Sequence, residues 1–122
     1  MKVCRRFRFD AAHFLPNYKG KCHNLHGHSF SVDISLEGPV DGKSGMVVDF
    51  AWIGECFESI TEDLDHRLLN DVIPNPTAEN IAALLFRRIK DEWIQGPGEL
   101  AQLGFVRVWE TPDSYAEVGP ND

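Results

Sequence analysis

The chemistry-bearing residues of this chain concentrate in one short segment, Cys22 to His28, which carries a thiol and ends in two imidazoles one residue apart. In an extended strand, residues i and i+2 point to the same face, so His26 and His28 could bind one metal ion together. In a helix the two rings would diverge by about 200°. From Phe30 to Glu37 apolar and polar residues alternate, which is typical of a strand. The segment therefore predicts a metal-binding pair on one strand face.

A third imidazole is available at His13, which ends a strand-like segment at the same parity as Phe9 and Ala11. Three histidines would leave one position of a tetrahedral zinc ion open, as in catalytic zinc sites. Such an ion polarises a substrate oxygen or lowers the pKa of a bound hydroxyl. The residue types alone leave two alternatives open. The histidines could be ordinary ones, and Cys22 could be a fourth ligand of a closed structural site rather than a free thiolate.

Two further clusters carry ionisable side chains. Asp65 and His66 are adjacent near the end of an expected helix, where a carboxylate could orient a histidine that activates Cys22. The alternative is a polar helix C-terminus. Glu110 ends an apolar strand, and a carboxylate leaving a buried strand needs a partner. A bound ring with two N–H donors and a nearby arginine are equally compatible with this position.

Length and composition restrict the class of protein. The 122 residues predict a single domain spanning 1–122. The net charge of −7 argues against a nucleic-acid partner, which would require clustered Lys and Arg. No apolar stretch approaches the roughly 18 residues of a membrane span, and the N-terminus lacks the apolar core of a signal peptide. Three scattered cysteines do not suggest a disulfide framework, so we expect a cytoplasmic protein.

The hydrophobic pattern predicts an α+β domain with the order β-β-α-α-β-β. The expected strands are 2–13, 26–37, 105–110 and 115–118, with a long loop at 14–25. A first helix is expected to follow the N-cap Asp49, with an apolar stripe that reaches Leu64. A second opens at Thr77 and ends before Gln95–Gly98. A four-stranded antiparallel sheet with both helices on one face accounts for this order.

Six motifs appear in sequence order along nearly the whole chain. They are Phe9–His13, Cys22–His28, Gly45–Phe50, Leu64–Asp65–His66 with Leu69–Asn70, Asn75–Asn80, and Glu110–Thr111. Together they resemble the 6-pyruvoyltetrahydropterin synthase and 6-carboxytetrahydropterin synthase family. The resemblance implies the T-fold, in which three subunits join their sheets into a barrel, two such rings stack as a hexamer, and active sites lie at subunit interfaces.

The resemblance also implies residue roles. The zinc ligands would be His13, His26 and His28, and the catalytic thiol would be Cys22, with Asp65 and His66 as its relay partners. The carboxylate that anchors the pterin ring would be Glu110. Thr77 and Glu79 match positions of the substrate pocket.

The implied substrate is 7,8-dihydroneopterin triphosphate. Three residues separate Cys22 from His26, as in the carboxytetrahydropterin branch of the family. We therefore expect carbon–carbon cleavage to 6-carboxy-5,6,7,8-tetrahydropterin, acetaldehyde and triphosphate, which serves queuosine synthesis. The alternatives are triphosphate elimination to the 6-pyruvoyl product and a non-catalytic structural-zinc module. Lys19, Lys21 and Arg67 are candidate triphosphate contacts, although surface solubility is the better explanation for any one of them.

Overall fold

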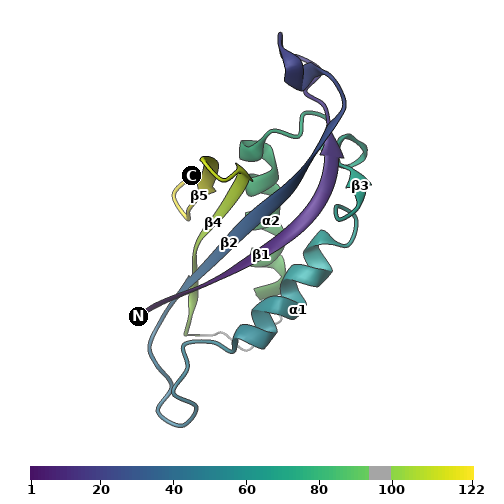
Figure 1. Cartoon of the computed structure of the whole chain (residues 1–122). Coiled ribbons are helices and arrows are strands. Elements are labelled where there is room, and N and C mark those ends of the chain that lie inside the picture. The colour runs from purple at the N-terminus through teal and green to yellow at the C-terminus, as the bar shows by residue number, and fades with distance from the viewer. Residues whose placement is uncertain (94–99) are drawn as a thin grey trace.

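A five-stranded sheet forms one layer of the protein, and two helices cover one of its faces (Figure 1). The computed structural model describes residues 1–93 and 100–122. The strands lie in the order β3-β1-β2-β4-β5. The four long strands are antiparallel, and β3 runs parallel to β1. The architecture therefore agrees with the predicted α+β class, except that it has one more strand than expected.

The first two strands form a long hairpin whose bounds match the prediction. β1 (Lys2–His13) pairs with β2 (His26–Glu37) over their whole length, from Lys2 opposite Glu37 to His13 opposite His26. The connection between them extends away from the body of the protein and contains a 3-10 helix at Lys21–His23 (Figure 1). The hairpin therefore brings two of the predicted metal ligands directly opposite each other.

The helices begin where their caps predict. α1 (Phe50–Thr61) follows Asp49, whose carboxylate accepts a hydrogen bond from the Ala51 N–H at 2.8 Å. α1 ends three residues before Leu64, which lies in a turn but remains fully buried. α2 (Ala78–Trp93) follows Thr77, and its predicted end at Gln95–Gly98 lies outside the described residues.

The remaining strands differ from the prediction in extent. β4 (Gln102–Thr111) begins three residues earlier than expected, and β5 (Ser114–Val118) begins one residue earlier. The short β3 (Arg67–Leu68) was not predicted. Two residues are too few to show an alternation, so this strand depends on its pairing with Ala11 and Ala12 of β1. A 3-10 helix at Leu69–Asp71 follows it.

The core lies between the sheet and the helices. Even-numbered residues of β2 and odd-numbered residues of β1 face the helices, and Phe9 stacks on Phe30 with ring centroids 5.1 Å apart. Each large apolar side chain buried here contributes about 1.5–3 kcal/mol. Cys56 of α1 belongs to this core, as expected, and burial raises the pKa of its thiol to about 11. Within the described ranges no helix is long and apolar enough to cross a membrane.

Candidate functional site

Three imidazoles meet where the β1–β2 hairpin leaves the sheet. His13 lies opposite His26 in the ladder, and His28 follows two residues later on the same face. The Nε2 atoms of His13 and His26 are 3.0 Å apart, and the three ring centroids lie 4.6 to 5.1 Å from one another. The strand alternation therefore brings together the three residues that the sequence singled out. Their role as zinc ligands remains a prediction.

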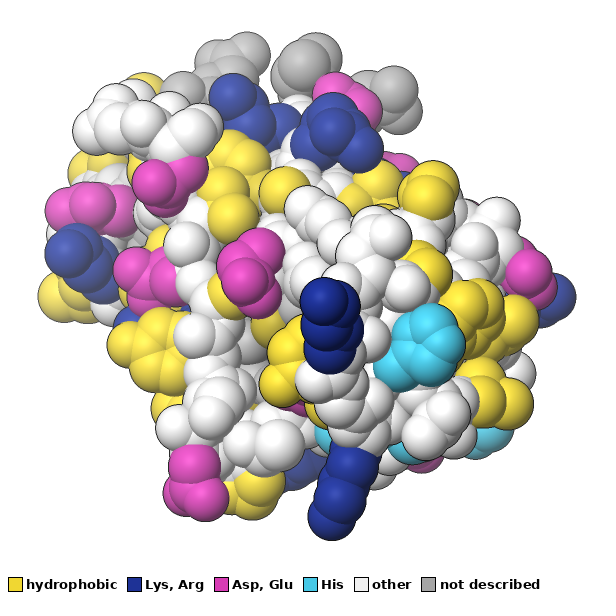
Figure 2. Space-filling model, turned by 90° about the horizontal axis from the view of Figure 1, so that it is seen from above, with side chains coloured by type: hydrophobic (Ala, Val, Ile, Leu, Met, Phe, Trp, Pro, Cys, Tyr) yellow, Lys and Arg dark blue, Asp and Glu magenta, His cyan; other side chains and the backbone are white. Residues whose placement is uncertain are grey.

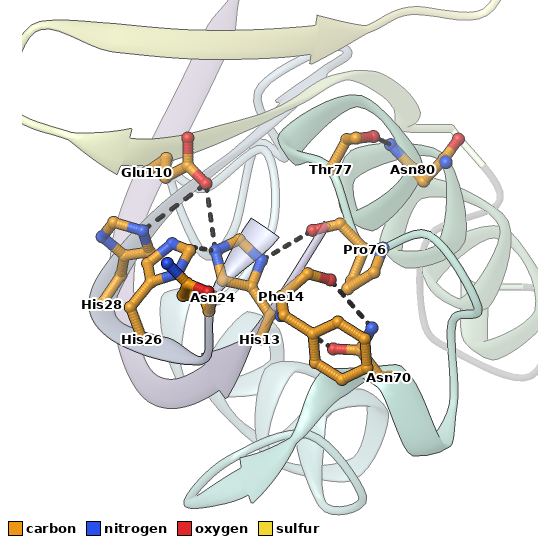
Figure 3. A network of polar contacts seen from close by, with 10 residues as sticks. All are labelled: His13, Phe14, Asn24, His26, His28, Asn70, Pro76, Thr77, Asn80 and Glu110. Atoms are coloured by element: carbon orange, nitrogen blue, oxygen red, sulfur yellow. Dashed lines mark hydrogen bonds and ion pairs between the residues drawn. The ribbon is translucent and has the colours of Figure 1, made fainter. Parts of the chain in front are cut away.

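Backbone carbonyls fix the tautomers of two of these rings. Nδ1 of His13 lies 2.8 Å from the carbonyl oxygen of Pro76, and Nδ1 of His26 lies 2.7 Å from that of Asn24 (Figure 3). A carbonyl only accepts, so each Nδ1 must carry the proton, and in the neutral ring Nε2 then presents a lone pair. Two such lone pairs face each other across 3.0 Å. This arrangement favours a cation between them, and such carbonyl bonds are typical of histidines that bind metals.

Glu110 supplies a fourth donor to the same group. Its Oε1 lies 3.3 Å from Nε2 of His13 and 3.6 Å from Nε2 of His28, while its second oxygen points away from the rings (Figure 3). All four donor atoms lie within 4.8 Å of one another. Tetrahedral zinc with bonds of about 2.0–2.1 Å separates its donors by about 3.3 Å. The separations of 3.0, 3.3 and 3.6 Å are close to this value, so the group could hold a zinc ion.

His28 has the surroundings of a neutral metal ligand. Its Nε2 is buried and has no hydrogen-bond partner among the described residues. Burial lowers the pKa of His28, and the nearby His13 and His26 lower it further, whereas Glu110 acts in the opposite direction. The ring is therefore neutral near pH 7, with a buried nitrogen that a metal ion would satisfy.

Asp65 and His66 form a hydrogen-bonded pair in the turn between α1 and β3. Asp65 Oδ1 lies 2.9 Å from Nδ1 of His66 and also accepts the N–H of Asp10 at 3.0 Å. The His66 N–H donates to the carbonyl of Asp10 at 2.6 Å, and His66 has a positive φ of 59°. Non-glycine residues seldom adopt this conformation. The pair thus belongs to an ordered turn and not to the end of the helix, where the sequence suggested it.

Cys22 lies in the 3-10 helix of the long loop and is partly exposed. Its carbonyl accepts the Leu15 N–H at 2.8 Å. Across the described ranges, no hydrogen bond or ion pair joins its thiol to Asp65, to His66 or to the candidate metal-binding group of His13, His26, His28 and Glu110. The structure of one chain therefore assembles the histidines and the Asp65–His66 pair separately, without a direct contact to the thiol.

Three further predicted site residues lie at the start of α2 and in β3. Thr77 caps α2, since its hydroxyl accepts the N–H of Asn80 at 3.2 Å, and Glu79 is exposed in the first turn. Arg67 lines a groove of about 620 Å³ that also includes His28 and His66. Figure 2 views the protein from above Figure 1 and shows Lys or Arg side chains next to a histidine, which the figure does not label, on that face.

Several residues that hold the site in place were not predicted. The carbonyls of Asn24 and Pro76 orient the histidines, and a backbone group leaves no signal in the sequence. Asn70 belongs to one of the recognised motifs, but only the structure shows that its amide holds the backbone next to His13.

Comparison with known proteins agrees with this geometry. A family model for 6-pyruvoyl tetrahydropterin synthase matches residues 2–121. The chain is 38% identical to a putative 6-carboxy-5,6,7,8-tetrahydropterin synthase of Archaeoglobus fulgidus, over 90% of this chain and 88% of the relative. It is 30% identical to the 6-carboxy-5,6,7,8-tetrahydropterin synthase of Haemophilus influenzae, over 95% and 96% of the two chains.

A third relative carries a different name. The chain is 36% identical to the dihydroneopterin monophosphate aldolase of Pyrococcus furiosus, over 89% of each protein. Among solved structures, Caenorhabditis elegans 6-pyruvoyl tetrahydropterin synthase superposes with a TM-score of 0.85 at 29% identity, over 98% of this chain and 94% of the other. The expected fold of the T-fold subunit is thereby confirmed, and the chain belongs to the 6-pyruvoyl tetrahydropterin synthase family.

Proposed function

We propose that this protein is a zinc-dependent 6-carboxy-5,6,7,8-tetrahydropterin synthase of queuosine biosynthesis. It would convert 7,8-dihydroneopterin triphosphate and water to 6-carboxytetrahydropterin, acetaldehyde and triphosphate. The observation that carries the proposal is the group of His13, His26 and His28, in which the Nε2 atoms of His13 and His26 lie 3.0 Å apart while both Nδ1 atoms bind backbone carbonyls. The names of the Archaeoglobus and Haemophilus relatives support the carboxy product.

The residues of the chain have separate tasks in this reaction. Bound zinc would act as a Lewis acid toward the side-chain oxygens of the substrate. Cys22 as a thiolate would take a proton from the side-chain carbon next to the ring. His66, oriented by Asp65 at 2.9 Å, would transfer a proton on the other side.

Glu110 would orient the pterin ring. A carboxylate pairs well with two parallel N–H donors, and this pairing uses both of its oxygens. One of these oxygens lies 3.3 Å from His13, so the side chain must turn away from the histidines when it binds the ring. In the absence of substrate, the same oxygen is available to the metal as a fourth donor.

We further propose that the active site lies between subunits of a trimer-based assembly, with a hexamer as the expected form. The loop that carries Cys22 extends from the body of the chain (Figure 1). Among the described residues, no hydrogen bond joins the thiol to Asp65 or His66. Along β1, the described pairing on the outer side reaches only Ala11 and Ala12. The open edge before them suits edge-to-edge pairing with a second chain.

One incubation tests the reaction. Zinc-loaded protein with 7,8-dihydroneopterin triphosphate should release acetaldehyde and 6-carboxytetrahydropterin, which mass spectrometry identifies. The 6-pyruvoyl product without acetaldehyde would instead establish triphosphate elimination. Because one relative is a dihydroneopterin monophosphate aldolase, the monophosphate is assayed in parallel. Turnover of the monophosphate alone would replace the proposal with that activity, and absence of both zinc and pterin binding would refute the enzyme assignment.

A further inference from the structure

The side chain of Asn70 holds both backbone groups of a single residue on another element. Its Oδ1 accepts the N–H of Phe14 at 3.0 Å, and its Nδ2 donates to the carbonyl of Phe14 at 2.9 Å (Figure 3). Asn70 lies in the 3-10 helix after β3, whereas Phe14 is the first residue after β1. One amide therefore pins the point at which the chain leaves the sheet.

Phe14 lies between the metal-binding group and the loop that carries the thiol. The preceding residue is His13, whose ring is held independently by the carbonyl of Pro76 at 2.8 Å. The following residue is Leu15, whose N–H donates to the carbonyl of Cys22 at 2.8 Å. Asn70 thus holds Phe14, and the next residue, Leu15, makes the hydrogen bond that fixes the backbone of Cys22.

Packing does little to hold this loop. None of the residues from 14 to 25 is buried, and the 3-10 helix at Lys21–His23 contains no buried residue. At the far end of the loop, Nδ1 of His26 binds the carbonyl of Asn24 at 2.7 Å. Within the single chain, hydrogen bonds at its two ends, rather than apolar contacts, therefore hold the loop in place.

We propose that Asn70 is a positioning residue that fixes Cys22 relative to the metal-binding histidines. The catalytic part of this inference rests on the proposed function, in which Cys22 moves a proton. The side chain must offer one acceptor and one donor at once, and an amide does so. A carboxylate keeps the bond to the Phe14 N–H but sets an oxygen against the Phe14 carbonyl. Alanine removes both bonds.

The test compares Asn70→Ala and Asn70→Asp with the matched control Asn80→Ala. Asn80 also donates its amide to a backbone carbonyl, that of Asn75 at 2.8 Å, and among the described residues no hydrogen bond joins it to the loop. Hydrogen exchange at the Leu15 N–H and alkylation of Cys22 are measured on the metal-loaded full chain. Cys4 is exposed on β1 and serves as an internal standard for alkylation.

We expect Asn70→Ala to accelerate both Leu15 exchange and Cys22 alkylation about tenfold, with metal content unchanged. Asn70→Asp should give a smaller increase, and it decides the question if the alanine variant does not fold. In turnover, kcat should fall while KM stays the same, because the thiol moves but the substrate-binding residues do not. The control should leave Leu15 exchange and the alkylation of Cys22 relative to Cys4 as in the wild type.

Two results would overturn the inference. Faster exchange at Phe14 alone, with Leu15 and Cys22 unchanged, would make the amide a purely local support. Loss of metal together with the loop bonds would show that Asn70 serves His13 and not the thiol. Neither the hydrogen exchange nor the alkylation measurement needs the pterin substrate. Failure of the proposed reaction can therefore be distinguished from failure of this inference.

Discussion

At the scale of single residues, the site depends on buried ring nitrogens, each of which needs a hydrogen-bond partner or a metal ion. The imidazole of His13 is fully buried, with Nδ1 on a carbonyl and Nε2 facing His26 and Glu110. Burial of neutral imidazoles that face one another costs free energy, unless a cation accepts their lone pairs. Metal binding and folding should therefore be coupled in this part of the chain.

The position of Cys22 separates a catalytic from a structural metal site. Its thiol is not part of the donor group formed by the histidines and Glu110. We expect Cys22→Ala to keep stoichiometric zinc and to change the free energy of unfolding by less than about 1 kcal/mol, while turnover falls at least a hundredfold. Metal analysis, thermal unfolding and product assay on one preparation check this. Loss of zinc with a lowered melting temperature would instead identify the closed structural site.

Glu110 allows a second test of the donor set. In Glu110→Gln the amide is a poorer metal ligand than the carboxylate, while the three histidines remain. We expect zinc to be retained but bound about tenfold more weakly, and KM for the pterin to rise because the charged partner of the ring is lost. Competition with a chromophoric chelator measures the affinity. An unchanged zinc affinity together with a raised KM would restrict Glu110 to the ring.

At the scale of the elements, an ion pair between the buried Asp33 and the half-exposed Arg6 ties strands together on the face without helices. Asp33 of β2 accepts bonds from Arg6 of β1 at 2.6 and 2.9 Å and from the indole N–H of Trp109 of β4 at 2.9 Å. The Arg6 hydrogen bond chiefly holds the pKa of Asp33 below its usual value, with help from Trp109 and against the effect of burial. This lowered pKa makes the stability of the sheet depend on pH.

The sign of that dependence follows from the direction of the shift. Because the pKa of Asp33 is lower in the folded chain, its contribution is complete above the unfolded value of about 3.9 and is lost as pH falls through the folded value. Asp33→Asn removes the titrating group and should cost about 1.5–3 kcal/mol at neutral pH. Denaturant unfolding between pH 7 and pH 2 should show the wild type and the variant converging on acidification. A constant difference would contradict this role.

The elements that the sequence predicted well are those with a strong local signal. The bounds of β1 and β2 agree with the prediction because their alternation is nearly unbroken, and Asp49 marks the start of α1 by its cap. The first three residues of β4 were not predicted, because Gly104 and a register shift opposite Ser35 interrupt the alternation of apolar and polar residues there. The carbonyls that orient His13 and His26 depend on tertiary structure, so no reading of residue types could supply them.

At the scale of the whole molecule, the open edges of the sheet and the extended loop both bear on how subunits would assemble. The outer edge of β1 is paired only at Ala11 and Ala12 within the described residues, and β5 forms the other edge of the sheet. The unpaired backbone groups of such an edge can pair with a strand of another chain. If rings of this chain form by such pairing, each Cys22 would meet an Asp65–His66 pair from a neighbouring chain rather than from its own.

Mixing two inactive variants tests that arrangement. Cys22→Ala lacks the proposed catalytic thiol and His66→Ala lacks its proposed relay imidazole, so each homogeneous assembly should be inactive. After subunit exchange at equal amounts, a site shared between neighbours receives both intact residues at about one quarter of the interfaces, since each partner is intact in half of the cases. We therefore expect about 25% of wild-type turnover to return in the mixture. A site contained within one chain would stay inactive at every mixing ratio, provided that mass spectrometry of the intact assemblies shows that subunits have exchanged.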